Sequence, residues 1–205
     1  MSAASQTREG DQSSAEDLAR ANVYALIGRL FYDAPDASLL AQIGIDRETP
    51  RQAGDASEYA QAWRALQDAC RSAHPAAVKQ EYDTLFVGVG KSEVTPYTSS
   101  YASRSAPDRH LVKLRDYLNA WGLTRNDAAF EIEDHISGLC DVMRFLIEQG
   151  ASLEDQRAFF EGFVYPGALP LCEAVTRAAS AGFYKQIALF TKAFLELDKA
   201  ALDMD

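Results

Sequence analysis

Apolar side chains recur at steps of three and four residues through almost the whole chain, and this helical periodicity limits the fold more than any other feature. The stripe formed by Tyr59, Trp63, Leu66 and Cys70 is typical, with spacings of four, three and four. No segment longer than five residues alternates apolar and polar side chains as a half-buried β-strand would. The sequence therefore predicts an all-α fold, a single-domain bundle of roughly nine helices.

Turn and capping signals divide this pattern into separate helices. A near capping box at Ser14 predicts the start of the first helix, and a loop is expected from Gly44 to Asp55. Pro166, Gly167 and Pro170 are expected to interrupt a late helical region. The remaining helices are expected near residues 37–43, 59–73, 75–86, 108–121, 136–149, 152–165 and 183–202.

The length of 205 residues suits one domain with a full hydrophobic core. Residues 1–13 have neither an apolar core nor a basic amphipathic face, so we expect them to form a disordered tail ahead of a helical domain at 14–205. No apolar run approaches the roughly eighteen residues that a membrane span needs. These features predict a cytoplasmic protein.

The charge and the cysteines argue against several kinds of partner. Thirty acidic and twenty basic residues give a net charge of −10, which repels nucleic acid and anionic membrane surfaces. Cys70, Cys140 and Cys172 form no CxxC pair and have apolar neighbours, so we expect three buried free thiols. We expect no stably bound metal or cofactor.

The Gly88–Ser92 segment, GVGKS, resembles the end of a phosphate-binding loop. The full pattern requires a glycine five positions before Gly90, where this chain has Leu85, and it requires a preceding strand. The simpler interpretation is that Gly88 and Gly90 end a helix. A nucleotide-binding hydrolase that uses this loop stays as a competing hypothesis.

Two further segments could bind a peptide. Tyr97 and Tyr101, interleaved with serine and threonine, form a mixture typical of peptide-binding surfaces. Asp134 would ordinarily be a helix N-cap, and His135 is expected to be neutral and hydrogen-bonded to a carboxylate or backbone group. The chain offers no nucleophile for a catalytic triad, so we expect no enzyme.

Both segments resemble a known family. Glu81-Tyr82-x-x-Leu85-Phe86-x-Gly88, followed by Pro96-Tyr97-x-Ser99-x-Tyr101, resembles the characteristic segment of the TorD/DmsD-like redox enzyme maturation chaperones. Glu131-x-x-Asp134-His135 is similar to the acidic-proline-Asp-His element that this family uses in client binding, although Ile132 stands where many members carry proline. Residues 164–171 also lack a tryptophan that relatives often show.

The resemblance implies a chaperone for the catalytic subunit of a molybdopterin enzyme. It would bind the apo form of that client and its N-terminal leader, often a twin-arginine signal, and the client rather than the chaperone would carry molybdopterin guanine dinucleotide. Asp134 and Glu131 would pair with leader arginines. Some relatives form domain-swapped dimers, so the resemblance allows a homodimer. The implied client-peptide site consists of Tyr82, Leu85, Phe86, Pro96, Tyr97, Ser99, Tyr101, Glu131, Asp134 and His135.

Two other interpretations compete with the client-binding role that the family resemblance implies. Tyr82, Leu85 and Phe86 lie at helical spacing and would by default be core residues. A helical adaptor for some other protein partner would also fit the chain, but it would show no preference for leader peptides.

Overall fold

The computed structural model describes residues 6–45, 57–88, 92–103, 107–123 and 133–204. Within these ranges the chain is helical and contains no strand, which confirms the predicted all-α class. The elements are α1 (Gln6–Tyr32), α2 (Ala37–Gly44), α3 (Glu58–Ser72), α4 (Pro75–Tyr82), η1 (Asp83–Val87), α5 (Ser99–Ala102), α6 (Pro107–Ala120), α7 (Ile136–Glu148), α8 (Leu153–Phe159), η2 (Phe160–Val164), α9 (Tyr165–Arg177) and α10 (Phe183–Met204).

Most helix limits agree with the sequence pattern, and the first helix is the exception. Helix α1 begins at Gln6 and not near Ser14, so the predicted capping box lies inside the helix. Residues 1–5 of the expected tail and residues 46–56 of the expected loop lie outside the described residues.

Side-chain caps explain several of the helix starts. The side chains of Asp36, Ser57 and Ser152 each accept a hydrogen bond from the backbone N–H three residues later, at 2.8, 3.2 and 3.1 Å. Each bond satisfies one N–H that the first helical turn leaves without a partner. The capping role predicted for Ser152 is confirmed.

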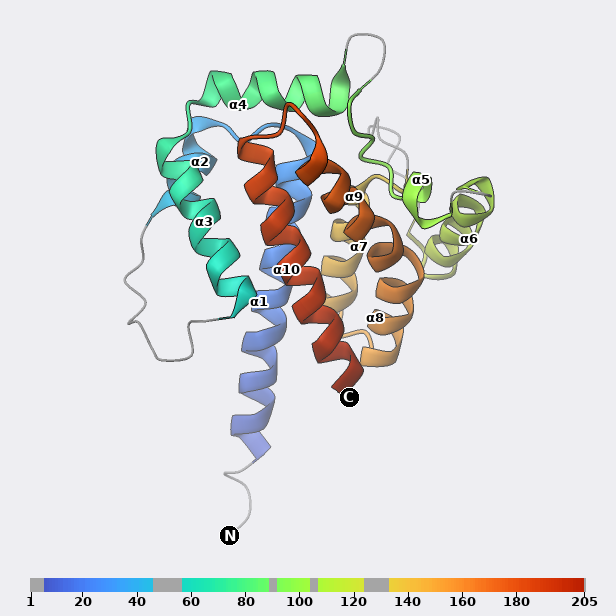
Figure 1. Ribbon diagram of the computed structural model, residues 1–205. Helices are drawn as coiled ribbons and strands as arrows, with labels where there is room; N and C mark the ends of the chain where they lie inside the picture. The colour runs from blue at the N-terminus through green and yellow to red at the C-terminus, as the bar shows by residue number, and fades with distance from the viewer. Residues whose placement is uncertain (1–5, 46–56, 89–91, 104–106, 124–132, 205) are drawn as a thin grey trace.

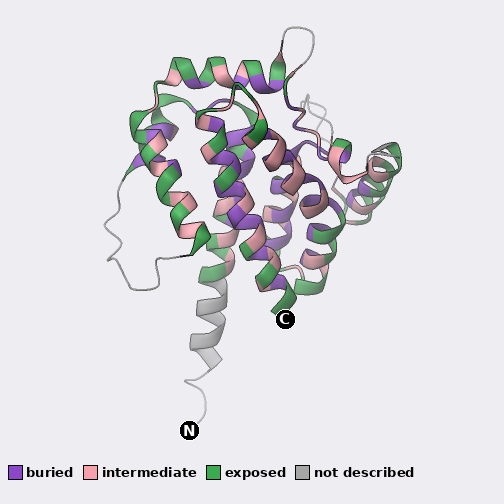
Figure 2. Ribbon diagram, in the orientation of Figure 1, coloured by how far each residue is buried: buried purple, intermediate pink, exposed green. Residues whose placement is uncertain are grey.

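The core lies between α1, α7 and α10. Helix α1 packs along α7, and α10 packs against α3 on one side and α9 on the other (Figure 1). Apolar side chains on the inward faces are fully buried, and the outer faces are exposed (Figure 2). Aromatic rings contribute much of this core, for example Tyr24 against Phe194 with ring centroids 4.9 Å apart.

The π-helical segment η2 carries the chain toward a place where the sequence predicts a break. Helix α8 runs through η2 directly into α9, which has Pro166 at its start and Pro170 inside it. The prediction that these prolines interrupt the helix is wrong. Proline lacks an N–H, and the wider π-helical turn just before α9 changes the backbone pairing where the first proline enters.

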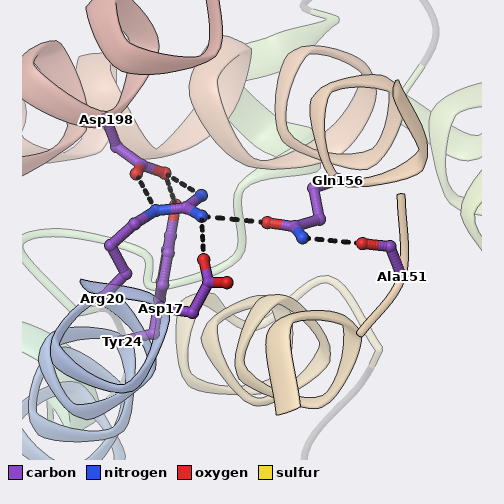
Figure 3. A network of polar contacts seen from close by, with 6 residues as sticks. All are labelled: Asp17, Arg20, Tyr24, Ala151, Gln156 and Asp198. Atoms are coloured by element: carbon purple, nitrogen blue, oxygen red, sulfur yellow. Dashed lines mark hydrogen bonds and ion pairs between the residues drawn. The ribbon is translucent and has the colours of Figure 1, made fainter. Parts of the chain in front are cut away.

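A buried polar network ties α1, α8 and α10 together (Figure 3). The Arg20 guanidinium donates to Asp198 Oδ1 at 2.7 Å and to Gln156 Oε1 at 3.0 Å, and the Tyr24 hydroxyl donates to Asp198 Oδ2 at 2.6 Å. Burial lowers the pKa of Arg20, but Asp198 more than offsets this and raises it overall. Burial and the Asp198 carboxylate raise the pKa of Tyr24. Asp198 is therefore a buried carboxylate whose charge is compensated.

The three cysteines are buried and free, as the sequence predicts. Burial raises the pKa of Cys70 to about 11 and of Cys172 to about 12, and it raises the pKa of Cys140 as well. The thiols are therefore protonated near neutral pH and serve as small apolar core groups.

Candidate functional site

The tyrosine-bearing segment and the Asp-His segment are joined directly in the structure. Tyr97 and His135 form an isolated antiparallel bridge. On either side of it, the Thr98 N–H donates to the Asp134 carbonyl at 2.9 Å, and the Ile136 N–H donates to the Pro96 carbonyl at 3.1 Å. We call residues 96–99 and 134–136 the motif junction.

The Asp134 side chain lies inside the motif junction and not at its rim. It is 3% exposed, and its Oδ2 accepts hydrogen bonds from the Ser99 N–H at 3.3 Å and from the Ser99 hydroxyl. The Thr98 hydroxyl adds a 3.0 Å bond to the Asp134 carbonyl. Asp134 therefore fixes the bend at residues 98–99. The sequence suggested that Asp134 is the N-cap of α7, but it is not.

His135 is the N-cap of α7. Its Nδ1 accepts a hydrogen bond from the Ser137 N–H at 3.2 Å and lies 2.6 Å from the Ser137 hydroxyl. Because a backbone N–H can only donate, this ring nitrogen carries no proton. The imidazole stands edge-on to the Tyr97 ring, with centroids 5.4 Å apart. The expected bond from His135 to a backbone group is present.

Helix α9 forms a wall of the motif junction through Gly167. A Cβ atom at this position would lie 2.5 Å from both the Cβ and the carbonyl oxygen of Thr98. No side chain fits there, so glycine is what allows α9 to approach the Thr98 backbone. This wall lies in the segment without the expected tryptophan.

Tyr82, Leu85 and Phe86 are core residues, all at most 8% exposed. The Tyr82 hydroxyl donates to the Tyr32 carbonyl at 2.7 Å, and the Phe86 ring packs on Tyr184 with centroids 5.2 Å apart. These contacts join the end of α4 to the end of α1, and η1 to the start of α10. They support the core interpretation of these three residues.

Glu81 has a structural role that the sequence analysis missed. Its carboxylate accepts the N–H groups of Gly182, Phe183 and Tyr184 at 2.8, 3.0 and 2.8 Å, and so caps α10 from a distant helix. The sequence analysis also missed Thr98, which belongs to the motif junction, and Ser137 and Gly167, which contact it. The only available signal was the place of Glu81 at the head of the quoted motif, because its partners lie about a hundred residues away.

The accessible groups in the motif junction and in the two residues that follow Ser99 are mainly aromatic rings and hydroxyls. Tyr97 and Tyr101 are half-buried, Ser100 is exposed, and the Tyr101 hydroxyl donates to the Thr95 carbonyl at 3.0 Å. Pro96 and Ser99 are buried. Glu131, which was expected to meet a client arginine, lies outside the described residues.

The structure gives little support to the competing sites. Gly88 ends η1 with φ of +63°, preceded by a helix and not by a strand, and residues 89–91 lie outside the described part. The described residues contain no group of side chains suited to a metal ion, and none of their helices is long and apolar enough to cross a membrane. A hollow of about 340 Å³ lies between α2 and α3, lined by Leu40, Cys70 and Arg71 among others, at the opposite side of the molecule from α5 (Figure 1).

Comparison with known proteins identifies the family. The family model described as nitrate reductase delta subunit matches residues 52–166, which is more than half of the chain and includes both motif segments. The chain belongs to the nitrate reductase delta subunit family. The nitrate reductase delta family comprises NarJ/TorD-like chaperones of redox enzyme maturation, so the resemblance seen in the sequence is confirmed.

The similarity to one relative extends beyond the matched region. An uncharacterized protein of Haemophilus influenzae is 27% identical over 172 residues, which cover 83% of this chain and 87% of that protein. Members of the nitrate reductase delta family act as chaperones in molybdoenzyme maturation and are not catalysts. This agrees with the expectation that the chain is not an enzyme.

Proposed function

We propose that this chain binds the N-terminal leader and the apo form of a molybdopterin-enzyme catalytic subunit and assists cofactor insertion before assembly or export. The observation that carries the proposal is the motif junction. It joins two segments from within the family-matched region and leaves Tyr97 and Tyr101 partly accessible. Such a surface suits a client peptide that is apolar with polar edges.

The residues of the site divide into contact and positioning roles in this proposal. Tyr97 and Tyr101 contact the leader, and Glu131 supplies a carboxylate for a leader arginine. Asp134 and His135 hold the bend and the start of α7 in place. Tyr82, Leu85, Phe86, Pro96 and Ser99 support these contacts from within the core.

Electrostatics and affinity fit a reversible chaperone. A net charge of −10 attracts a basic leader and speeds encounter with it. A micromolar complex requires only about −8 kcal/mol, which a few aromatic contacts and ion pairs supply, and it still permits release. We place leader binding and cofactor insertion in the cytoplasm. The client carries molybdopterin guanine dinucleotide, and this chain holds no cofactor. A homodimer is compatible with this role.

Titration calorimetry with a leader peptide tests the proposal. The peptide carries two adjacent arginines ahead of an apolar segment, and a scrambled peptide of the same composition is the comparison. We expect the double variant Tyr97→Ala/Tyr101→Ala to bind at least about tenfold more weakly, because truncating even one central tyrosine typically costs about 1–2 kcal/mol of binding energy. Tyr32→Ala, which removes an exposed tyrosine at the end of α1, is the matched control and should bind like the wild type.

The outcomes separate the competing functions. Equal binding of the scrambled peptide would indicate a general helical adaptor. If Lys91→Ala abolished a nucleotide hydrolysis activity of the wild type, the chain would be an enzyme. Circular dichroism of every variant shows whether weaker binding reflects unfolding.

A further inference from the structure

Helix α6 covers an aromatic surface beside the motif junction. It lies at the edge of the molecule, next to α5 (Figure 1). Its Tyr117 ring packs on Phe159 and Phe163, with centroids 5.2 and 5.5 Å apart, and its His110 ring lies 5.5 Å from that of Phe163. The two phenylalanines belong to α8 and η2, so α6 shields an apolar face of the body of the bundle.

The same helix places basic groups next to the carboxylates that precede α7. Both oxygens of Glu133 accept hydrogen bonds from the Arg115 guanidinium at 3.2 Å. Burial lowers the pKa of His110, and the nearby negative charge of Asp134 opposes this shift. The covered surface therefore combines aromatic rings with the Glu133 carboxylate.

The polar contacts that hold α6 to this surface are weak. The Nε2 atom of His110 is buried without a hydrogen-bond partner in the described part of the chain, which is unfavourable. The Arg115 side chain is 49% exposed, so solvent screens its ion pair with Glu133. The Tyr117 hydroxyl reaches the Asp155 carbonyl only at 3.3 Å. Helix α6 is therefore easier to displace than the central helices.

The chemistry of α6 matches that of a basic leader segment. In a chain with net charge −10, α6 carries three basic and two acidic residues and turns Leu114 and Leu118 inward. Resting on the proposed function, we infer that the surface under α6 is the docking site for the basic amphipathic segment of the client leader. Helix α6 occupies this site in the free protein, and the leader displaces it.

Displacement also gives the Glu133 carboxylate a route to the client. When α6 leaves, the surface of Phe159, Phe163 and Glu133 opens. A leader arginine then replaces Arg115 at Glu133. The apparent affinity for the leader is the intrinsic affinity multiplied by the fraction of molecules in which α6 is displaced.

Hydrogen exchange of the full chain tests the displacement directly. The probe is the synthetic leader peptide with two adjacent arginines ahead of an apolar segment. We expect residues 107–120 to lose amide protection when the peptide binds, while α1 and α7 keep theirs. If the peptide binds and residues 107–120 keep or gain protection, the inference is wrong but the proposed function stands. If the peptide does not bind at all, the proposed function itself fails.

Affinity measurements on α6 variants provide an independent test. Tyr117→Ser removes the main aromatic contact of α6 and leaves Phe159 and Phe163 in place, so we expect several-fold tighter peptide binding. His110→Phe keeps the ring contact but removes the unpartnered nitrogen, so α6 is held more firmly and binding should weaken several-fold. Asn119→Ser, on the exposed face of the same helix, should change nothing. Weaker binding by Tyr117→Ser, with its helical content intact, would overturn the inference.

Discussion

Glu81 is one carboxylate that organises the start of a whole helix. It accepts three consecutive N–H groups at the N-terminus of α10, where the helix dipole also favours negative charge. The same residue heads the motif that relates the chain to its family. Part of that motif therefore serves the stability of the fold, and a variant there affects function indirectly.

Replacing Glu81 with alanine should destabilise the protein by about 1–2 kcal/mol, because helix caps and charges at helix ends are each worth about 1 kcal/mol. Urea denaturation followed by circular dichroism measures this change. Glu16→Ala, an exposed glutamate on α1, is the control and should stay within about 0.5 kcal/mol of the wild type. An equal effect of both variants would show that the capping bonds contribute nothing.

Asp134 and His135 show what a local sequence pattern can predict and what it cannot. The sequence indicated a cap and a backbone-bonded imidazole at the start of α7, and both features exist, but His135 is the cap. Asp134 instead turns toward Ser99, thirty-five positions earlier in the chain. Local spacing cannot reveal a partner at that separation, so the burial of Asp134 could not be predicted.

At the scale of elements, the approach of α9 to the bend at Thr98 depends on the absence of a side chain. Gly167→Ala should destabilise the protein by about 1–3 kcal/mol, since the new methyl group would overlap the Thr98 backbone. Thermal unfolding followed by circular dichroism measures the loss.

Gly162 provides the matched control for this prediction. It lies in η2, and a Cβ atom there would meet nothing within 4 Å. Gly162→Ala should leave stability unchanged or raise it by up to about 1 kcal/mol, because alanine favours helix. An equal loss of stability in both variants would mean that the contact with Thr98 does not explain the effect at Gly167.

Helix positions were predictable because each rests on a pattern a few residues long. The stripe at Tyr59 to Cys70 and the cap at Ser152 place α3 and α8 correctly. The π-helical segments η1 and η2 were not predictable, since their apolar spacing looks like that of an ordinary helix over five residues. The continuation of α9 through Pro170 was not predicted either.

At the scale of the whole molecule, Asp198 links α10 to α1 directly and, through Arg20, to Gln156 on α8. Asp198→Ala should destabilise the protein by roughly 3 kcal/mol, because Arg20 and Tyr24 would lose a buried charged partner. Urea denaturation measures the free energy of unfolding. The double variant Arg20→Met/Asp198→Leu should recover most of the loss, since it removes both charges together.

The result of the double variant decides what the network does. Recovery of stability in the double variant means that the loss in Asp198→Ala comes from leaving Arg20 without its buried partner. If the double variant is as unstable as Asp198→Ala, the pair itself stabilises the join between α1 and α10, and Gln156 on α8 is the next residue to test.

The antiparallel bridge at Tyr97 and His135 also closes the intervening stretch into a loop. Its two ends are held together by main-chain hydrogen bonds. Lengthening a loop between fixed ends costs little. A change of chain length between the two bridge residues is therefore expected to cost little in loop-closure entropy.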